Sequence, residues 1–218
     1  MRSEIRDRPA FANVHVELQR GDRIWAEADA MASMSTDIEL SPRFAGGFLQ
    51  ALLRRLFGGE SLFVNEFSTP SSGEVVLTQP FPGDIECIDL RDTELFLQPG
   101  AFLACELGVK LFVGFAGFAS MIGGEGLFRL RVGGRGRVWF GAYGGIFAQE
   151  VADELLVDTG HLVAYEPSIA LRSRLSGGLL SSVLSGEGLV TSVRGPGRVY
   201  LQTRSIKGLS AWTNSHLF

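Results

Sequence analysis

Two glycine-rich strings decide the fold. The first is Gly123-Gly124-Glu125-Gly126-Leu127-Phe128 followed by Gly133-Gly134-Arg135-Gly136-Arg137-Val138-Trp139-Phe140, and the second is Ser185-Gly186-Glu187-Gly188-Leu189-Val190 followed by Gly195-Pro196-Gly197-Arg198-Val199-Tyr200-Leu201. A third copy stands upstream, as Gly58-Gly59-Glu60-Ser61-Leu62-Phe63 and then Ser71-Ser72-Gly73-Glu74-Val75-Val76-Leu77. Each copy is typical of a turn, a strand, a hairpin and a second strand. The sequence therefore predicts an all-β chain of three repeated meander units.

A second block recurs ahead of each copy. Its glycine is followed six residues later by a glutamate, which gives Glu27, Glu106 and Glu166. The units span approximately residues 11–90, 91–150 and 151–210. A unit of a few short strands cannot bury its apolar face alone, so we expect one compact, pseudo-threefold domain over residues 1–218.

The first unit is longer because of the segment between Leu40 and Gly58. Its apolar residues recur at helical spacing, at positions 44, 48, 49, 52, 53, 56 and 57. We predict one short helix inserted in the first unit, packed over an open end of the β structure. A helix that binds a membrane surface or a partner is the alternative.

Composition narrows the function classes. Among 218 residues, 45% are hydrophobic, which is enough for an ordinary core, and the 28 glycines indicate many turns. The formal charge of −4 argues against broad electrostatic capture of nucleic acid. Two cysteines are too few for a disulfide framework or a zinc site.

The lack of an export signal in the sequence favours a cytoplasmic protein. The N-terminus has no apolar signal region, and Leu111–Gly124, the longest uncharged apolar stretch, is too short to span a bilayer. We expect no transmembrane segment. Leu111–Gly124 is predicted to be buried or covered by a subunit, with an exposed membrane contact as the alternative.

The ordered strings resemble a known family. Phe11–Leu18, Gly21-Asp22, Ala26–Met31, Gly58–Phe63 and Pro80–Ile85 look like the altered-inheritance-of-mitochondria family, in its bacterial form, over nearly the whole chain. The resemblance implies a fold similar to that of the tryptophan RNA-binding attenuation protein and assembly into small homo-oligomers. It implies no catalytic residue.

The repeated glutamates carry two interpretations. Glu60, Glu125 and Glu187 would supply hard oxygen ligands if the pseudo-threefold axis brought them together, as in a metal-dependent enzyme. We favour a structural role, because a glutamate in a tight glycine turn accepts hydrogen bonds from free backbone N–H groups. The histidines and serines show no catalytic motif, so we expect neither a catalytic site, nor a metal, nor a cofactor.

The arginines form a candidate binding surface. Arg129, Arg131, Arg135 and Arg137 crowd one hairpin, and Arg198 lies in the related one. Arginine suits phosphate and base edges, so an RNA-binding module is an alternative, opposed by the net negative charge. Our main interpretation is a non-catalytic, oligomeric binding or scaffolding protein, with protein partners.

Overall fold

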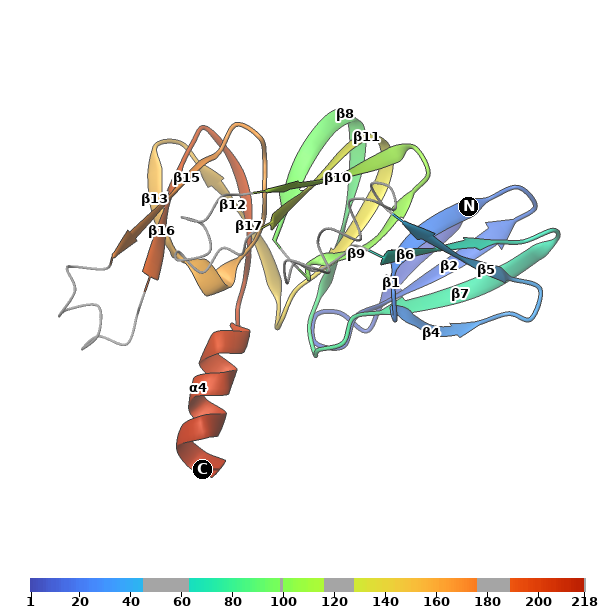
Figure 1. The fold of residues 1–218 in the computed structure, drawn as a ribbon, viewed down its shortest axis with the longest axis horizontal. Helices are drawn as coiled ribbons and strands as arrows, with labels where there is room; N and C mark the ends of the chain where they lie inside the picture. Colours follow the sequence, from blue (N-terminus) through green and yellow to red (C-terminus); the bar gives the residue numbers. More distant parts are fainter. Residues whose placement is uncertain (45–62, 99, 116–127, 176–188, 218) are drawn as a thin grey trace.

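The computed structural model describes residues 1–44, 63–98, 100–115, 128–175 and 189–217. These residues form strands β1 to β17, a short 3-10 turn η1 (Thr159–His161) and helix α4 (Ile206–Leu217), arranged as in Figure 1. The all-β prediction is confirmed. The helix expected between Leu40 and Gly58 falls mainly on residues 45–62, outside the described residues, whereas α4 was not predicted.

Group 1 is our name for strands β2 to β7. Their bounds are β2 (Asn13–Gln19), β3 (Arg23–Glu27), β4 (Met31–Met34), β5 (Glu39–Phe44), β6 (Phe63–Ser68) and β7 (Ser72–Thr78). Strands β2 and β4 pair with β7, and β3 and β5 pair with β6, all antiparallel. Strand β1 (Arg2–Arg6) adds to the outer edge of β2. On β2, Val14, Val16 and Leu18 are buried, the period-two pattern of a strand with one face in the core.

Group 2 makes the same four pairings with longer strands. It consists of β8 (Ile85–Leu97), β9 (Phe102–Glu106), β10 (Val109–Phe115) and β11 (Phe128–Gly141). A register shift between Gly134 and Arg135 divides β11 in two. Its first half pairs with β10 and the end of β8, and its second half pairs with β9 and the start of β8.

Group 3 again has six strands. They are β12 (Ile146–Val151), β13 (Glu154–Asp158), β14 (Leu162–Tyr165), β15 (Ala170–Leu175), β16 (Leu189–Arg194) and β17 (Gly197–Gln202). Strands β12 and β14 pair with β17, and β13 and β15 pair with β16. The strands of each group can therefore be numbered from first to sixth in chain order, and strands with the same number have the same partners. In group 2 the start and end of β8 are the first and second strands, and the two halves of β11 are the fifth and sixth.

The third strands β4, β9 and β14 show how closely the groups correspond. Each has a register shift against the sixth strand of its group. At the end of each third strand, a side-chain oxygen accepts a backbone N–H of the sixth strand at 2.9 Å: Ser35 from Glu74, Glu106 from Arg137, and Glu166 from Arg198.

Ser35 is thus the group 1 counterpart of Glu106 and Glu166, and the sequence alignment that put Glu27 in that place is wrong. Glu27 ends β3, which is the second strand of its group. The predicted unit boundaries at residues 90/91 and 150/151 fall inside β8 and β12. The similarity to the attenuation protein stays a prediction.

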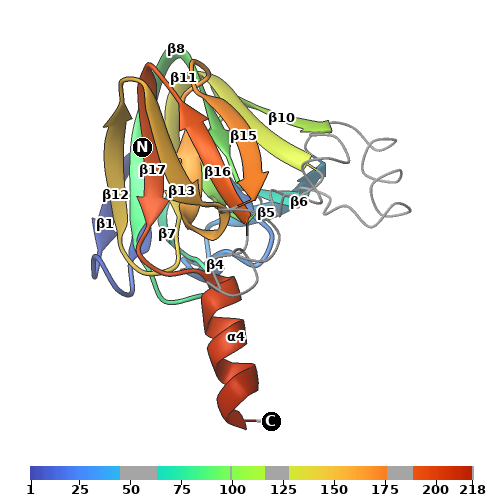
Figure 2. The ribbon, with the colours of Figure 1, turned by 90° about the vertical axis from the view of Figure 1, so that its left-hand side faces the viewer.

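Strand pairing also joins the groups, and we call these two pairings the joints. The second strand of one group pairs with the third strand of the next, β3 with β9 and β8 with β14. The groups lie side by side in a row, and α4 projects away from them, as Figures 1 and 2 show. Three clusters of buried apolar side chains fill the row, and the largest members include Phe67, Trp139 and Phe140.

Candidate interaction surfaces

The predicted arginine surface lies on β11 and β17. Arg129, Arg131, Arg135 and Arg137 are all on β11, and Arg198 on β17 is the counterpart of Arg137. The backbone of Arg129 pairs with Gly114 of β10, and its side chain lies outside the described residues. The other four guanidinium groups each meet a carboxylate.

The contacts of Arg131 and Arg135 are near the solvent. Arg131 lies 3.1 Å from Glu94, and its guanidinium stands 4.5 Å from the ring centroid of Phe112, a cation–π geometry. Arg135 pairs with Asp92. Pairs this exposed contribute little to stability, but they neutralise the charge that would attract a phosphate.

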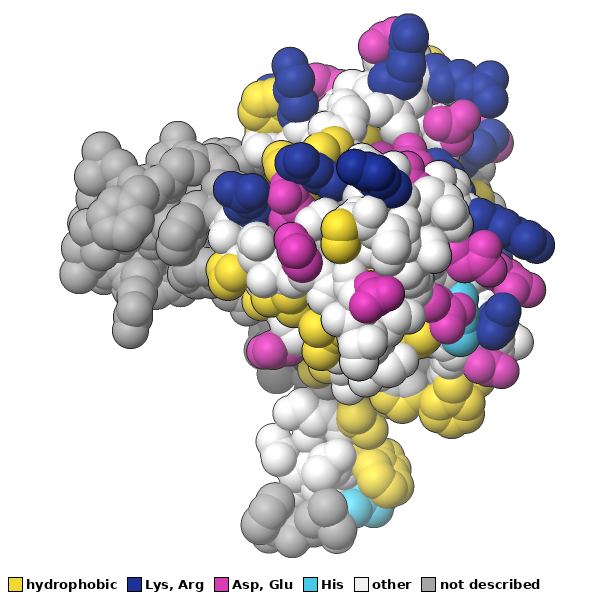
Figure 3. Space-filling view, turned by 90° about the vertical axis from the view of Figure 1, so that its right-hand side faces the viewer, with side chains coloured by type: hydrophobic (Ala, Val, Ile, Leu, Met, Phe, Trp, Pro, Cys, Tyr) yellow, Lys and Arg dark blue, Asp and Glu magenta, His cyan; other side chains and the backbone are white. Residues whose placement is uncertain are grey.

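Arg137 and Arg198 belong to the repeated contact at the third strands. Arg137 donates to Glu106 at 2.7 Å and also reaches Ser3 Oγ and the carbonyl oxygen of Met1. Arg198 pairs with Glu150, whose hydrogen bond is the main cause of a raised pKa for that guanidinium. Figure 3 shows basic and acidic side chains interspersed at the group 1 end of the molecule. These described arginines tie the strands together and form no continuous basic patch.

The repeated glutamates, for which we favoured a structural role over metal binding, divide into two sets. Glu60, Glu125 and Glu187 lie outside the described residues. Glu106 and Glu166 accept backbone N–H groups. Among the residues that the structure describes, no three histidine, cysteine or acidic side chains are grouped as metal ligands would be.

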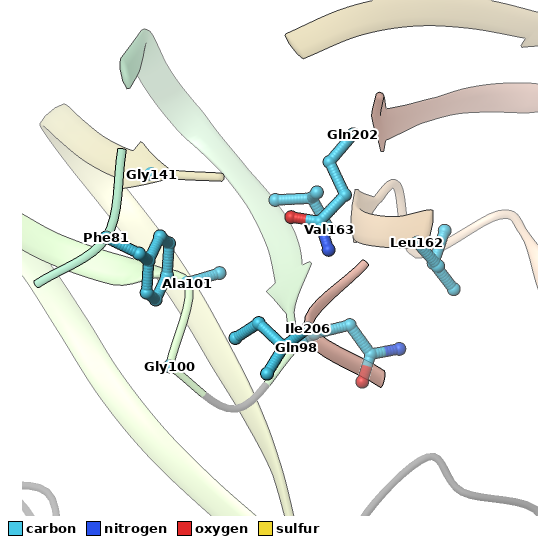
Figure 4. A pocket seen from close by; sticks show the side chains of 9 residues that line it. All are labelled: Phe81, Gln98, Gly100, Ala101, Gly141, Leu162, Val163, Gln202 and Ile206. Atoms are coloured by element: carbon cyan, nitrogen blue, oxygen red, sulfur yellow. The ribbon is translucent and has the colours of Figure 1, made fainter. Parts of the chain in front are cut away.

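A pocket of about 270 Å³ lies between group 2, group 3 and the start of α4. Figure 4 shows its lining side chains. They are Phe81, Gln98, Gly100, Ala101, Gly141, Leu162, Val163, Gln202 and Ile206. Gln202 uses its amide to bond the Tyr143 backbone N–H and the Gly160 carbonyl, both at 2.8 Å, while Gln98 Nε2 has no partner. None of these nine residues is a nucleophile or an acid, so the described lining is suited to binding a neutral group.

Helix α4 carries an apolar side that the β groups do not cover. Ile206, Leu209 and Trp212 recur at helical spacing and are 47–59% exposed, and His216 stacks on Trp212 with ring centroids 4.6 Å apart. The helix begins at a cap, because Ser205 Oγ accepts the Gly208 N–H at 3.0 Å. That serine and the helical spacing of Ile206, Leu209 and Trp212 are the sequence signals that could have predicted the helix.

The apolar stretch Leu111–Gly124 is described only to residue 115. Leu111 packs against the group 2 core, and Phe112 is exposed beneath Arg131. No helix in the described part of the chain has the length and hydropathy needed to cross a membrane. Cys87 is half-buried and Cys105 is buried, and both are free thiols.

The chain is similar to a protein family, to a bacterial protein and to a solved structure. A family model described as Mitochondrial biogenesis AIM24 matches residues 3–204. An uncharacterized protein of Streptococcus pyogenes serotype M6 is 24% identical over 226 residues, which cover 100% of this chain and 91% of that protein. A Streptococcus pyogenes protein solved by X-ray crystallography has a TM-score of 0.81 and 24% identity, with 99% of each chain covered. That structure shows the same fold.

Proposed function

The chain belongs to the Mitochondrial biogenesis AIM24 family, and we propose that it is a non-catalytic binding protein that works as a homo-oligomer and holds a partner protein through α4. The observation that carries the proposal is the apolar side of α4. Three large side chains, Ile206, Leu209 and Trp212, face solvent on a helix that stands clear of the β groups (Figure 2).

Physical chemistry supports a partner for this helix. Twelve residues are at the lower limit of helix stability in water, and Gly208, Thr213 and Asn214 are poor helix formers. An amphipathic helix normally gains its stability from burial of its apolar side. Ile206 also lines the pocket at the helix base, so a partner segment that covers α4 would also lie over this pocket.

Two further observations support a binding role. Four arginines of the candidate surface are engaged by carboxylates within the chain, which gives the RNA-binding alternative no support from them: Arg131, Arg135, Arg137 and Arg198. Glu106 and Glu166 are used as acceptors for backbone N–H groups, as a structural acid would be. We also propose a cytoplasmic location, where free thiols such as Cys87 and Cys105 stay reduced.

Site-specific photo-cross-linking in the native cell tests this function. A cross-linking amino acid at position 212 should give a discrete adduct with another protein, and one at Asn214, on the opposite side of the same helix, should not. Equal adducts from both positions, or none from position 212, would contradict partner binding by α4. Native mass spectrometry of the purified chain tests the oligomer, and a monomer at every concentration would contradict that part.

A further inference from the structure

Strands β4 and β13 differ from their counterparts in one respect. In the described residues β4 is the last strand of its sheet and pairs only with β7, and β13 is the last strand of its sheet and pairs only with β16. The other third strands, β9 and β14, pair with a neighbouring group, and so do the other second strands, β3 and the end of β8. Among the described residues, the row of groups therefore ends in a third strand, β4, and a second strand, β13, that each have one edge without a neighbouring strand.

We propose that these two edges bind each other between copies, so that β13 of one chain pairs antiparallel with β4 of the next. The proposal rests on the homo-oligomer proposed above and names its interface. It repeats between chains the pairing that each chain already makes twice within itself.

The two joints within the chain fix the register. At the first joint Trp25 lies opposite Cys105, and at the second Phe96 lies opposite Tyr165. The pairing of the second and fifth strands places Leu156 of β13 where Trp25 and Phe96 stand, since their partners on the fifth strands are Ser192, Glu66 and Arg131. The pairing of the third and sixth strands places Met34 of β4 where Cys105 and Tyr165 stand. Leu156 should thus face Met34 of the neighbouring chain, and Val157 should face Ser33.

Burial at these positions agrees with the proposal. Within the chain, Cys105 and Tyr165 are almost fully buried, and the Phe96 and Tyr165 rings stack 5.1 Å apart. At the free edges, Leu156 is 61% exposed and Met34 is 39% exposed. The second-strand position is apolar in every group, and so is the third-strand position. The free edges of β4 and β13 therefore carry the kind of side chains that meet at a joint, but have no partner strand.

A second copy of this chain is the partner that fits both edges. The two edges are complementary in strand order, direction and register, because they belong to the second and third strands that pair at both joints. Exposed strand edges bind other strands readily unless they are blocked by charge, proline or a covering element. The interface is heterologous, and it closes into a ring or continues as a filament according to the rotation per copy.

Mixed cysteine cross-linking tests the pairing in the full chain. One variant carries Leu156→Cys and the other Met34→Cys, both with Cys87→Ser, and a tag on one distinguishes their masses. The burial that raises the pKa of Cys105 keeps that thiol out of the reaction. We expect oxidation or a short bismaleimide to yield mainly the 156–34 species. A Leu156→Cys and Phe147→Cys mixture is the matched control, because Phe147 is also exposed but lies on β12.

Three other outcomes would overturn the proposal. A dominant 156–156 product would indicate a symmetric contact instead. An oligomeric chain without the 156–34 product would remove this interface while the homo-oligomer stands, and a monomeric wild-type chain would remove both. A second variant, Leu156→Asp, should raise the protein concentration at which the oligomer forms at least tenfold. Phe147→Asp should leave that concentration unchanged. Both changed side chains are exposed, so their melting temperatures should stay near that of the wild type.

Discussion

Replacement of Glu106 by alanine tests the contact that recurs beside the third strands. Glu106 accepts the backbone N–H of Arg137 at 2.9 Å and its guanidinium at 2.7 Å. The loss of a partly buried acceptor leaves that N–H unpaired, which costs about 1–3 kcal/mol. The partly exposed ion pair adds up to about 1 kcal/mol. We expect Glu106→Ala to lower the free energy of unfolding by about 2–3 kcal/mol, which is a fall of about 4–12 °C in melting temperature for a chain of this size.

Glu94→Ala is the matched control for this experiment. Glu94 pairs with Arg131 at 3.1 Å on the same sheet, and the contact joins two side chains and no backbone N–H. Its loss should cost less than about 1 kcal/mol. Glu166→Ala and Ser35→Ala should lie between Glu106→Ala and the control. Each removes the acceptor of a backbone N–H, while the guanidinium beside Glu166 pairs with Glu150. Calorimetry of the four variants measures this order, and a Glu106→Ala chain no less stable than Glu94→Ala would refute the structural role of the repeated contact.

The remaining predictions concern a close backbone approach, an acid and the thiols. Gly108→Ala should unfold at a clearly lower temperature, because a Cβ there would stand 2.0 Å from the Arg135 carbonyl oxygen; a melting temperature equal to the wild type would contradict this approach. Hydrogen bonds from Trp25 and then Arg43 lower the pKa of Glu66 below the ordinary 4.5 against its burial, so Glu66 stabilises the fold above pH 4.5 and loses this effect as the pH falls through its folded pKa. Melting temperatures from pH 6 to about pH 3 should therefore fall less steeply for Glu66→Gln than for the wild type, and parallel curves would exclude this role. Burial raises the pKa of Cys87 to about 11, so alkylation at pH 8 should be slow in the folded chain and fast in denaturant, and equal rates would show an accessible thiolate.

Residue pattern predicted the β class well, because period-two alternation is a local signal. The predicted hairpins at Gly133–Arg137 and Gly195–Arg198 were wrong. Gly133–Arg137 lies within the continuous strand β11, at its register shift, and β16 and β17 on either side of Gly195-Pro196 pair with other strands and not with each other. The correspondence of Glu27 with Glu106 failed because a second strand and a third strand show the same alternation, and spacing alone does not separate them. The true counterpart, Ser35, replaces a carboxylate by a hydroxyl, which hides it from a search for repeated acids.

The candidate surfaces were harder to predict for a different reason. The arginines were visible, but their carboxylate partners come from other strands, such as Asp92 and Glu94 of β8, and the register that joins them is a property of the fold. Helix α4 contains glycine, threonine and asparagine and is short, so propensity gave little signal. The unpaired edges β4 and β13 emerge only when the pairing of all three groups is compared.

Hydrogen exchange of the full wild-type chain, measured at low and high protein concentration, tests the central claim of head-to-tail strand pairing most directly. The account predicts that amides of residues 31–34 and 154–158 become protected as the concentration rises, since each would gain hydrogen bonds from the other edge. Strand β12, at residues 146–151, provides the internal control because it is also the last strand of its sheet among the described residues and takes no part in the proposed pairing. Protection at 31–34 and 154–158 that does not change with concentration, while the chain is oligomeric, would contradict the account.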